Sequence, residues 1–518
     1  MNADRQKVIL VVLDGWGIAQ PSKGNAITQA KTPAINSLEK EYFATTLQAS
    51  GIAVGLPWGR EGNSEVGHLN LGAGRIIYQY LPRIVSAIRD GSFFSNKAFV
   101  HAVKFVKRNN STLHIMGLFS SGSVHSYADH LYGLLDMMKQ QKVENVVLHI
   151  FTDGKDASPT EAVTFLKGLQ ELLKKEGSGK IGTVMGRAYA MDRNGNWSYT
   201  QKAYEAIVNG KGETAEDPVE YIKRSYQKGK TDFYVEPAIM VENGNPVGLV
   251  KENDALIFFN FREDSARQLT QAFVLPDEEF SDFPRNKIQG LFFVAMTKYQ
   301  ENLPVEVAFP PPEVKNPLAK VLSDSGIKQL HISEREKYAH VTYFFNGENE
   351  IAYPGEERIL IPSTSAQEYE TAPEMQAYNI TQRVIASMPN FDFILINYAN
   401  ADMLAHTGNI QATINSIEAL DANIFSLVET AKKSNFSLVI TADHGHAEEM
   451  FELKTGMPKT SHSGNPVPLY IMHDNYRSRE YSPLYSRNPE GVLADVAPTI
   501  LKIMGIAKPQ EMTGKSLI

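Results

Sequence analysis

Short apolar runs rich in β-branched residues recur along the chain and alternate with amphipathic stretches of helical length. The clearest runs occupy residues 8–13, 113–118, 146–151, 180–185, 255–260, 291–296, 391–397 and 436–441. Runs that are apolar throughout are typical of parallel strands buried on both faces, and helices between them supply the crossover connections. The alternation therefore predicts an α/β fold with parallel sheets.

Polar side chains follow several of these predicted strands. Asp14 comes directly after the first run, Asp156 and Arg262 follow runs in the middle of the chain, and Asp402 and Asp443 follow the last two. In open parallel sheets the ligand lies beyond the carboxyl ends of the strands. We therefore expect functional side chains at these positions.

The length and the punctuation of the chain indicate more than one domain. The 518 residues exceed what one hydrophobic core usually organises. Three successive prolines, Pro310–Pro312, favour a stiff extended connector. A glycine-containing turn at 72–75, followed by a polar tract, indicates an earlier crossing. We therefore expect domain boundaries near residues 78 and 311.

Composition excludes several kinds of site and partner. The chain has no cysteine, which excludes disulfides, thiolate zinc sites, iron–sulfur clusters and cysteine nucleophiles. Its net charge is −8 without a long run of Lys or Arg, so we expect no broad surface for nucleic acid or anionic lipid. No segment approaches the ~18 apolar residues of a membrane-spanning helix, and the run before Asp14 is too short for a signal sequence. These features predict a cytoplasmic protein.

Candidate ligands for divalent cations lie at the first strand and in the C-terminal part of the chain. Asp402 and His406 are four residues apart and would share one face of a helix. The other candidates follow predicted strands or lie in a predicted loop: Asp14, Asp443, His444 and His462. Each alone has a structural alternative, such as a surface pair on a helix or an ordinary loop histidine. Together they predict a mixed nitrogen and oxygen site with room for two ions, which suits phosphoryl transfer.

A serine in a glycine-flanked turn is the candidate nucleophile. Ser64 lies in the string GNSEVGH (62–68), ahead of a helix-compatible segment. A helix N-terminus favours phosphate, and a hydroxyl held by a divalent cation loses its proton near neutral pH. The structural alternative is that Ser64 is the helix N-cap, a role that is compatible with catalysis. His68 is an alternative base, which the metal ions would make unnecessary.

Longer strings around these residues run in order along the whole chain: LDGWG (13–17), GNSEVGHLNLGAGR (62–75), VHSY (124–127), DGKD (153–156), GRAYAMDRN (186–194), FFNFRED (258–264), EKYAHVTYFFNG (336–347), NYANADMLAHTG (397–408), TADHGHAEEM (441–450) and SHSGNPVP (461–468). They resemble the cofactor-independent, or 2,3-bisphosphoglycerate-independent, phosphoglycerate mutases of the alkaline phosphatase superfamily. The resemblance implies an alkaline-phosphatase-like, parallel-sheet, metal-binding domain that is split in sequence by an inserted α/β transferase domain. Carried over, the first domain comprises residues 1–78 and 312–518, and the inserted domain comprises residues 79–311. The resemblance also suggests a monomer.

The same resemblance implies a set of site residues. One metal ion would be held by Asp402, His406 and His462, and the other by Asp14, Ser64, Asp443 and His444. The substrate residues would be His125, Lys155, Asp156, Arg187, Arg193, Arg262 and Lys337. The metal of the family is most often manganese, with zinc, cobalt and magnesium as alternatives, and no 2,3-bisphosphoglycerate is needed.

The implied reaction is the interconversion of 3-phosphoglycerate and 2-phosphoglycerate, a step of glycolysis and gluconeogenesis, through a phosphoserine at Ser64. Lys337 is the candidate for charge compensation of the leaving alkoxide, and Asp156 is the candidate proton relay. The three arginines offer planar donors to a carboxylate or a phosphate. A solvated surface arginine is the structural alternative for Arg193.

Three departures from the family pattern fall in the predicted inserted domain. Lys155 stands where the family usually has arginine, Ser265 stands where the pattern NFRxDR has arginine, and residues 120–123 (SSGS) replace an Asp- and Gly-containing turn. Lysine keeps the charge but lacks the bidentate fork of arginine. We therefore expect Lys155 and Ser265 to weaken the hold on the glycerate.

Two other functions stay open on the sequence alone. A metal-dependent phosphatase or phosphonate hydrolase of the same superfamily would share Ser64 and the metal ions but would release phosphate to water. A non-catalytic protein that binds carbohydrate phosphates would keep the fold. Release of free phosphate identifies the first, and tolerance of a Ser64 substitution identifies the second.

Overall fold

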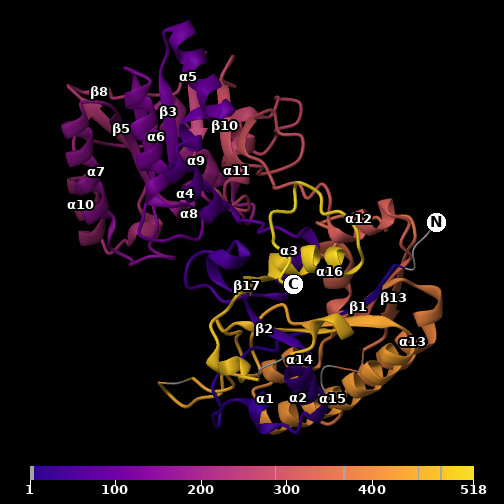
Figure 1. The fold of residues 1–518 in the computed structure, drawn as a ribbon. Coiled ribbons are helices and arrows are strands. Elements are labelled where there is room, and N and C mark those ends of the chain that lie inside the picture. The colour runs from indigo at the N-terminus through magenta and orange to yellow at the C-terminus, as the bar shows by residue number, and fades with distance from the viewer. Residues whose placement is uncertain (1–4, 286, 364, 366–368, 453, 479–480) are drawn as a thin grey trace. The chain divides into compact units, whose positions relative to one another are not determined.

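A computed structural model describes residues 5–285, 287–363, 365, 369–452, 454–478 and 481–518. The chain forms two compact units (Figure 1). Unit 1 comprises Met1–Gln79 and Pro312–Ile518, and unit 2 comprises Tyr80–Pro311. Unit 2 is thus inserted into the sequence of unit 1, and the Pro-rich segment lies at the second junction. The functional roles of the two units stay predictions.

Unit 1 contains a mixed sheet in which parallel pairs predominate. Among its described strands, only β16 pairs in the antiparallel direction, with β15 on one side and β2 on the other. The strands follow the order β13 (Glu356–Ile361), β12 (Gln329–Glu334), β14 (Phe393–Tyr398), β1 (Lys7–Leu13), β15 (Phe436–Thr441), β16 (Val467–Met472), β2 (Phe43–Gln48) and β17 (Gly491–Val492).

Helices cover both faces of this sheet (Figure 1). One group packs around α15 and contains α1 (Ala26–Gln29), α2 (Pro33–Glu41), α13 (Ala377–Ser387), α14 (Asn400–His406) and α15 (Ile410–Lys433). The other contains α3 (Ser64–Ala73), α12 (Leu318–Asp324) and α16 (Val496–Ile503). Strand β1 is buried throughout Val8–Leu13 because it has a parallel strand on each side and a helix layer on each face.

Unit 2 contains a second sheet of the same kind. Its described neighbours are parallel except where β7 meets β5 and β8. The order is β11 (Glu306–Phe309), β10 (Phe292–Thr297), β9 (Ala255–Phe258), β3 (Leu113–Leu118), β4 (Val146–Thr152), β5 (Lys180–Gly186), β7 (Ala238–Glu242) and β6 (Glu213–Ala215), with β8 (Asn245–Pro246) paired to β7.

Two apolar layers enclose the sheet of unit 2, because successive side chains of a strand point to opposite faces. In β3, Leu113 and Ile115 join one layer, whereas Met116 and Leu118 join the other. The first layer includes α4 (Tyr80–Asp90), α5 (Lys97–Asn109), α6 (Ala128–Gln140), α7 (Ala162–Glu176) and α10 (Pro218–Gln227). The second includes α8 (Arg187–Ala190), α9 (Trp197–Asn209) and α11 (Arg267–Val274).

The strands predicted from apolar runs are present, and two of them, 113–118 and 436–441, have the predicted bounds. The strand predicted at 255–260 ends at Phe258, because the side-chain oxygen of Asn260 accepts the hydrogen bond of the Leu118 N–H. The antiparallel strand β2 was not predicted because its sequence, FATTLQ, has no apolar run. None of the helices in the described ranges has both the length and the apolar composition needed to cross a bilayer.

Unit 2 also buries a histidine whose charge depends on folding. His130 in α6 is fully buried against the rings of Tyr127 and Phe261, and neither ring nitrogen has a hydrogen-bond partner among the described residues. Burial lowers the pKa of His130 to about 3. Below the ordinary histidine pKa, the unfolded chain therefore binds a proton that the folded chain does not, and stability falls as pH falls.

We predict that His130→Leu makes the acid loss of stability shallower. Each such histidine contributes up to roughly 1.4 kcal/mol per pH unit to the slope of unfolding free energy below about pH 6.5. Denaturant unfolding between about pH 7 and about pH 5 measures this slope. The exposed His101, changed to Leu, is the control. Equal slopes for the wild type and His130→Leu would contradict the prediction.

Candidate active site

Ser64 is the first residue of α3, and its side chain is buried. The interpretation of Ser64 as the N-cap is wrong: Asn63 is the cap, and its side-chain oxygen accepts a hydrogen bond from the Val66 N–H at 2.9 Å. Since the cap is supplied by its neighbour, the Ser64 hydroxyl is directed at other polar groups. Its Oγ lies 2.8 Å from Lys337 Nζ, 3.0 Å from His444 Nε2 and 3.2 Å from Asp14 Oδ1.

Two glycines allow the elements around Ser64 to approach closely. Gly15, after β1, has φ +73, and a Cβ there would lie 2.8 Å from Asp402 Cα. A Cβ on Gly67 of α3 would lie 2.6 Å from the Asp443 carbonyl oxygen. The Asp402 N–H also donates to the Asp14 carbonyl oxygen at 3.1 Å. The carboxylates that follow β1, β14 and β15 therefore converge at one edge of the sheet.

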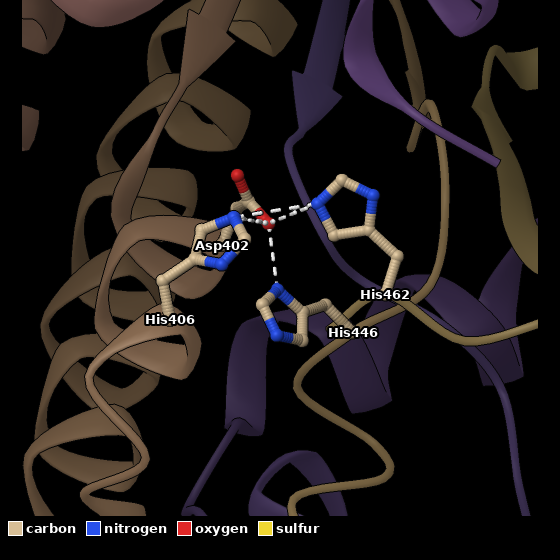
Figure 2. Close-up of side chains that lie close together, drawn as sticks. All are labelled: Asp402, His406, His446 and His462. Atoms are coloured by element: carbon tan, nitrogen blue, oxygen red, sulfur yellow. Dashed lines mark hydrogen bonds and ion pairs between the residues drawn. The ribbon is translucent and has the colours of Figure 1, made fainter. Parts of the chain in front are cut away.

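The first donor group joins α14 to two loops (Figure 2). Asp402 Oδ1 lies 3.5 Å from His406 Nε2 and 3.5 Å from His462 Nε2, and these two nitrogens are 3.3 Å apart. His446 Nδ1 lies 2.7 Å from the same Asp402 oxygen. The Nδ1 atoms of His406 and His462 donate to the carbonyls of Thr460 and Gly62, which leaves each Nε2 as a lone-pair donor. Three of these four residues were predicted as ligands, and His446 was not.

The second donor group contains Asp14, Asp443 and His444, all fully buried. His444 Nε2 lies 3.4 Å from Asp14 Oδ1 and 3.6 Å from Asp443 Oδ2. The latter oxygen lies 3.3 Å from His68 Nδ1 but makes no well-aligned hydrogen bond among the described residues. Imidazole and carboxylate donors, with an unsatisfied buried oxygen, fit a divalent cation.

Lys337 links the two donor groups. Its Nζ lies 2.7 Å from Asp14 Oδ1, 2.7 Å from Asp402 Oδ2 and 2.8 Å from Ser64 Oγ. Burial lowers the pKa of Lys337, but the carboxylates of Asp14, Asp402 and Asp443 outweigh burial and raise the pKa above its ordinary value. Lys337 follows β12 and precedes a π-helical turn at His340–Phe344, a feature common at functional sites.

Two carboxylates of this site, those of Asp402 and Asp443, stay ionised although they are buried. Burial raises the pKa of Asp402, but the Lys337 ammonium and the bonded histidines outweigh burial and hold it well below its usual value. The pKa of Asp443 is also lowered, because His444, His68 and Lys337 outweigh burial. Burial lowers the pKa of His444, but the three carboxylates outweigh it and raise the pKa to about 10. The three buried carboxylates thus outnumber the Lys337 ammonium and the His444 imidazolium, and this favours cation binding.

Residues inside the quoted strings support the site and were not predicted to do so. Asn397 Nδ2 donates to Asp14 Oδ2 at 2.7 Å. His68 Nδ1 lies 3.3 Å from Asp443 Oδ2 and 2.8 Å from the Ser64 carbonyl oxygen. The His68 ring therefore faces a carboxylate rather than the Ser64 hydroxyl, and the structure gives no support to His68 as the base.

A second polar cluster lies in unit 2, beyond the ends of β4 and β5. Arg187 donates to Asp153 Oδ1 at 2.6 Å and to Asp156 Oδ2 at 2.5 Å. His125 Nε2 lies 3.6 Å from the same Asp156 oxygen. Burial, followed by the charge of Arg187, lowers the pKa of His125 to about 4. His125 is therefore neutral at pH 7.

The remaining predicted residues of unit 2 join this cluster through shared partners. Arg193 and Arg262 both pair with Asp264. Ser265 is buried, and its Oγ lies 2.8 Å from His125 Nδ1. The structure thus gathers His125, Asp156 and the three arginines, whereas the Lys155 side chain, exposed like those of Arg193 and Arg262, makes no ion pair with these residues. Lys337, which was predicted to contact substrate, lies beside Ser64 in unit 1.

The fold and these groups define a two-unit α/β protein whose first unit surrounds a buried serine with two candidate metal-binding groups. A family model described as "BPG-independent PGAM N-terminus" matches residues 84–301. The 2,3-bisphosphoglycerate-independent phosphoglycerate mutase of Moorella thermoacetica is 47% identical over 100% of this chain and 99% of its own length. That of Clostridium beijerinckii is 45% identical over 99% of each chain.

A solved structure of Leishmania mexicana phosphoglycerate mutase, determined at low cobalt concentration, is also similar. It is 29% identical, covers 99% of this chain and 98% of its own, and has a TM-score of 0.53. The chain belongs to the 2,3-bisphosphoglycerate-independent phosphoglycerate mutase family. The resemblance of the sequence strings and the predicted α/β fold class are therefore confirmed.

We predict that Lys337→Met destabilises the metal-free protein far more than the metal-loaded protein. The substitution leaves three buried carboxylates without their ammonium, and breaking a buried pair costs about 3–5 kcal/mol. Divalent cations would offset the same negative charge. Thermal unfolding in chelator and in added Mn²⁺ measures the difference, with Lys320→Met, which breaks an exposed pair with Asp324, as control. An equal loss of stability with and without metal would count against this view of the site.

Proposed function

We infer that this chain is an isomerase that interconverts 3-phosphoglycerate and 2-phosphoglycerate without 2,3-bisphosphoglycerate, the activity for which its family is named. We further propose that Ser64 carries the phosphoryl group between the two positions. One observation supports this most directly: the buried Ser64 hydroxyl contacts Lys337, His444 and Asp14. The same family membership favours a mutase over the phosphatase, phosphonate hydrolase and non-catalytic alternatives.

We propose that two divalent cations bind to unit 1. Asp402, His406 and His462 would hold one, and Asp14, Ser64, Asp443 and His444 would hold the other. When bound, the ions supply positive charge that stabilises the transferring phosphoryl group and acidifies the Ser64 hydroxyl. The sequence resemblance favours manganese, with zinc, cobalt or magnesium as alternatives, because nitrogen and oxygen donors accept all four.

The transfer needs two similar displacements at phosphorus. Ser64 Oγ, after losing its proton, forms a bond to phosphorus as the bond from phosphorus to the first glycerate oxygen breaks, and that oxygen takes up a proton. The other glycerate hydroxyl then attacks the phosphoserine, and the bond to Ser64 breaks. Lys337 Nζ lies 2.8 Å from Ser64 Oγ. In the second displacement, where Oγ is the leaving oxygen, Lys337 donates a charge-assisted hydrogen bond to it as negative charge develops there. Neither of these two displacements releases phosphate to water.

We assign substrate orientation to the cluster of unit 2. Arg187, Arg193 and Arg262 present planar donors to a carboxylate or phosphate, in exchange for their present aspartate partners. His125 is neutral and contributes a hydrogen bond. Asp156 would relay the proton of the glycerate hydroxyls. Small phosphoglycerates are the substrates that the family membership supports, and the cytoplasmic location and the monomeric state stay our predictions from the sequence.

We predict that Ser64→Ala lowers mutase activity by at least about a thousandfold, because the residue that carries the phosphoryl group is lost. Intact-protein mass spectrometry after rapid acid quench should find one added phosphoryl group on the wild type and none on the variant. Ser37→Ala, which removes an exposed hydroxyl bonded to Glu41, is the control. A variant that retains activity would refute the role of Ser64.

We also predict that the double variant Lys155→Arg, Ser265→Arg lowers the KM for 3-phosphoglycerate. Each arginine adds charge-assisted hydrogen bonds to an anionic substrate, and one such bond changes binding by about tenfold. Ser265→Arg also removes the contact with His125 Nδ1, so each single variant is measured as well. An unchanged KM in the double variant would reject the expectation that these two positions limit affinity.

A further inference from the structure

We propose that His446 is a fourth protein ligand of the ion that Asp402, His406 and His462 hold. This inference rests on the proposed function only in requiring that this donor group binds a metal ion. It adds a residue that neither the ligand spacing nor the family resemblance indicated. It also makes the two groups unlike in chemistry, because this one would have three imidazoles and the other has one.

The distances within the group match the edges of a coordination tetrahedron. Zinc binds imidazole nitrogen and carboxylate oxygen at about 2.0–2.2 Å, so ligand atoms around a tetrahedral ion lie about 3.3–3.6 Å apart. The separations among Asp402 Oδ1, His406 Nε2 and His462 Nε2 are 3.5, 3.5 and 3.3 Å. These three atoms form one face of such a tetrahedron, and a fourth corner is left.

His446 has a donor atom in reach of that corner. The four residues each offer one ligand atom, and these atoms all lie within 4.8 Å of one another. The His446 ring centroid is 4.4 Å from that of His406 and 5.1 Å from that of His462. Figure 2 shows its Nδ1 directed at the Asp402 carboxylate, as the Nε2 atoms of the other two histidines are. The 2.7 Å contact between Nδ1 and Asp402 Oδ1 is a hydrogen bond that ligation would replace.

The rest of the His446 ring makes no competing polar contact. The ring is fully buried, and its Nε2 has no hydrogen-bond partner among the described residues. The polar chemistry of this buried ring is therefore directed at the donor group.

The backbone around His446 is held in place before any ion binds. The His446 N–H donates to Glu448 Oε2 at 2.8 Å, and the same carboxylate oxygen accepts the Gly17 N–H at 3.0 Å. The segment after β15 thus supplies Asp443 and His444 to one donor group and His446, two residues further on, to the other. A single loop then connects both proposed ions.

Nuclear magnetic resonance of bound ¹¹³Cd tests the inference in the wild-type protein. Full-length protein with ¹⁵N-labelled histidine rings is stripped of metal and loaded with ¹¹³Cd²⁺. We expect two cadmium resonances, one coupled to three histidine nitrogens and one coupled to a single nitrogen from His444. Two couplings in place of three would overturn the inference and leave His446 as a hydrogen-bond donor to Asp402. Absence of bound cadmium would overturn both the inference and the proposed metal groups.

A variant series gives an independent readout. His446→Asn should reduce the three couplings to two and weaken cadmium binding at this group by more than about tenfold. His473→Asn, in a surface turn outside the site, should leave three. Affinity alone does not separate a ligand from a supporting residue, since either loss weakens metal binding. Three couplings that persist in His446→Asn would refute the assignment.

Discussion

The site of unit 1 depends on an imbalance of buried charge. Asp14, Asp402 and Asp443 are removed from water, and the Lys337 ammonium bonds directly to two of them. Burying ionised groups is costly unless opposite charges are close. The Lys337 ammonium and the His444 imidazolium, whose pKa is raised to about 10, do not neutralise three carboxylates, so the chain holds negative charge that a divalent cation relieves. The same ammonium contacts Ser64 Oγ, and the nucleophile therefore sits where positive charge is concentrated.

The sheet of unit 1 brings the three carboxylates together. Strands β1, β14 and β15 are adjacent and parallel, so the residues after them meet at one edge, although Asp14 is hundreds of positions from Asp402 and Asp443 in sequence. Gly15 and Gly67 let the following segments come within contact of Asp402 and Asp443, where a side chain would clash. The rigid, buried strands fix the donor atoms before a ligand arrives, which is the condition for electrostatic stabilisation of a transition state.

Much of this arrangement was predictable from local pattern. Continuous apolar runs identify parallel strands because both faces are buried, and the polar residue after each run marks the edge where ligands bind. The i, i+4 spacing of Asp402 and His406 was also informative, because residues four apart share one face of a helix. The predicted helix is present as α14. By contrast, β2 has no apolar run to recognise, and its antiparallel pairing with β16 depends on tertiary contacts.

The missed residues were missed for a physical reason. His446 follows His444 by two positions, and only the path of the loop turns its ring toward Asp402 rather than toward Asp14. The role of Asn63 as helix cap, which displaced Ser64 from that position, depends on a side-chain rotamer. The link from Ser265 to His125 joins residues 140 positions apart. Sequence spacing carries no information on such contacts, whereas the longer motif strings were sufficient to identify the family.

The most direct measurement of the central claim is the number of divalent ions that the metal-stripped chain takes up. Native mass spectrometry during titration with Mn²⁺ should find two ions per chain. Asp402→Asn and Asp443→Asn should each lower that number by one, because each removes a carboxylate from a different donor group. A chain that binds no ion, or that binds two ions regardless of these carboxylates, would contradict the view that the buried negative charge exists to hold metal around Ser64.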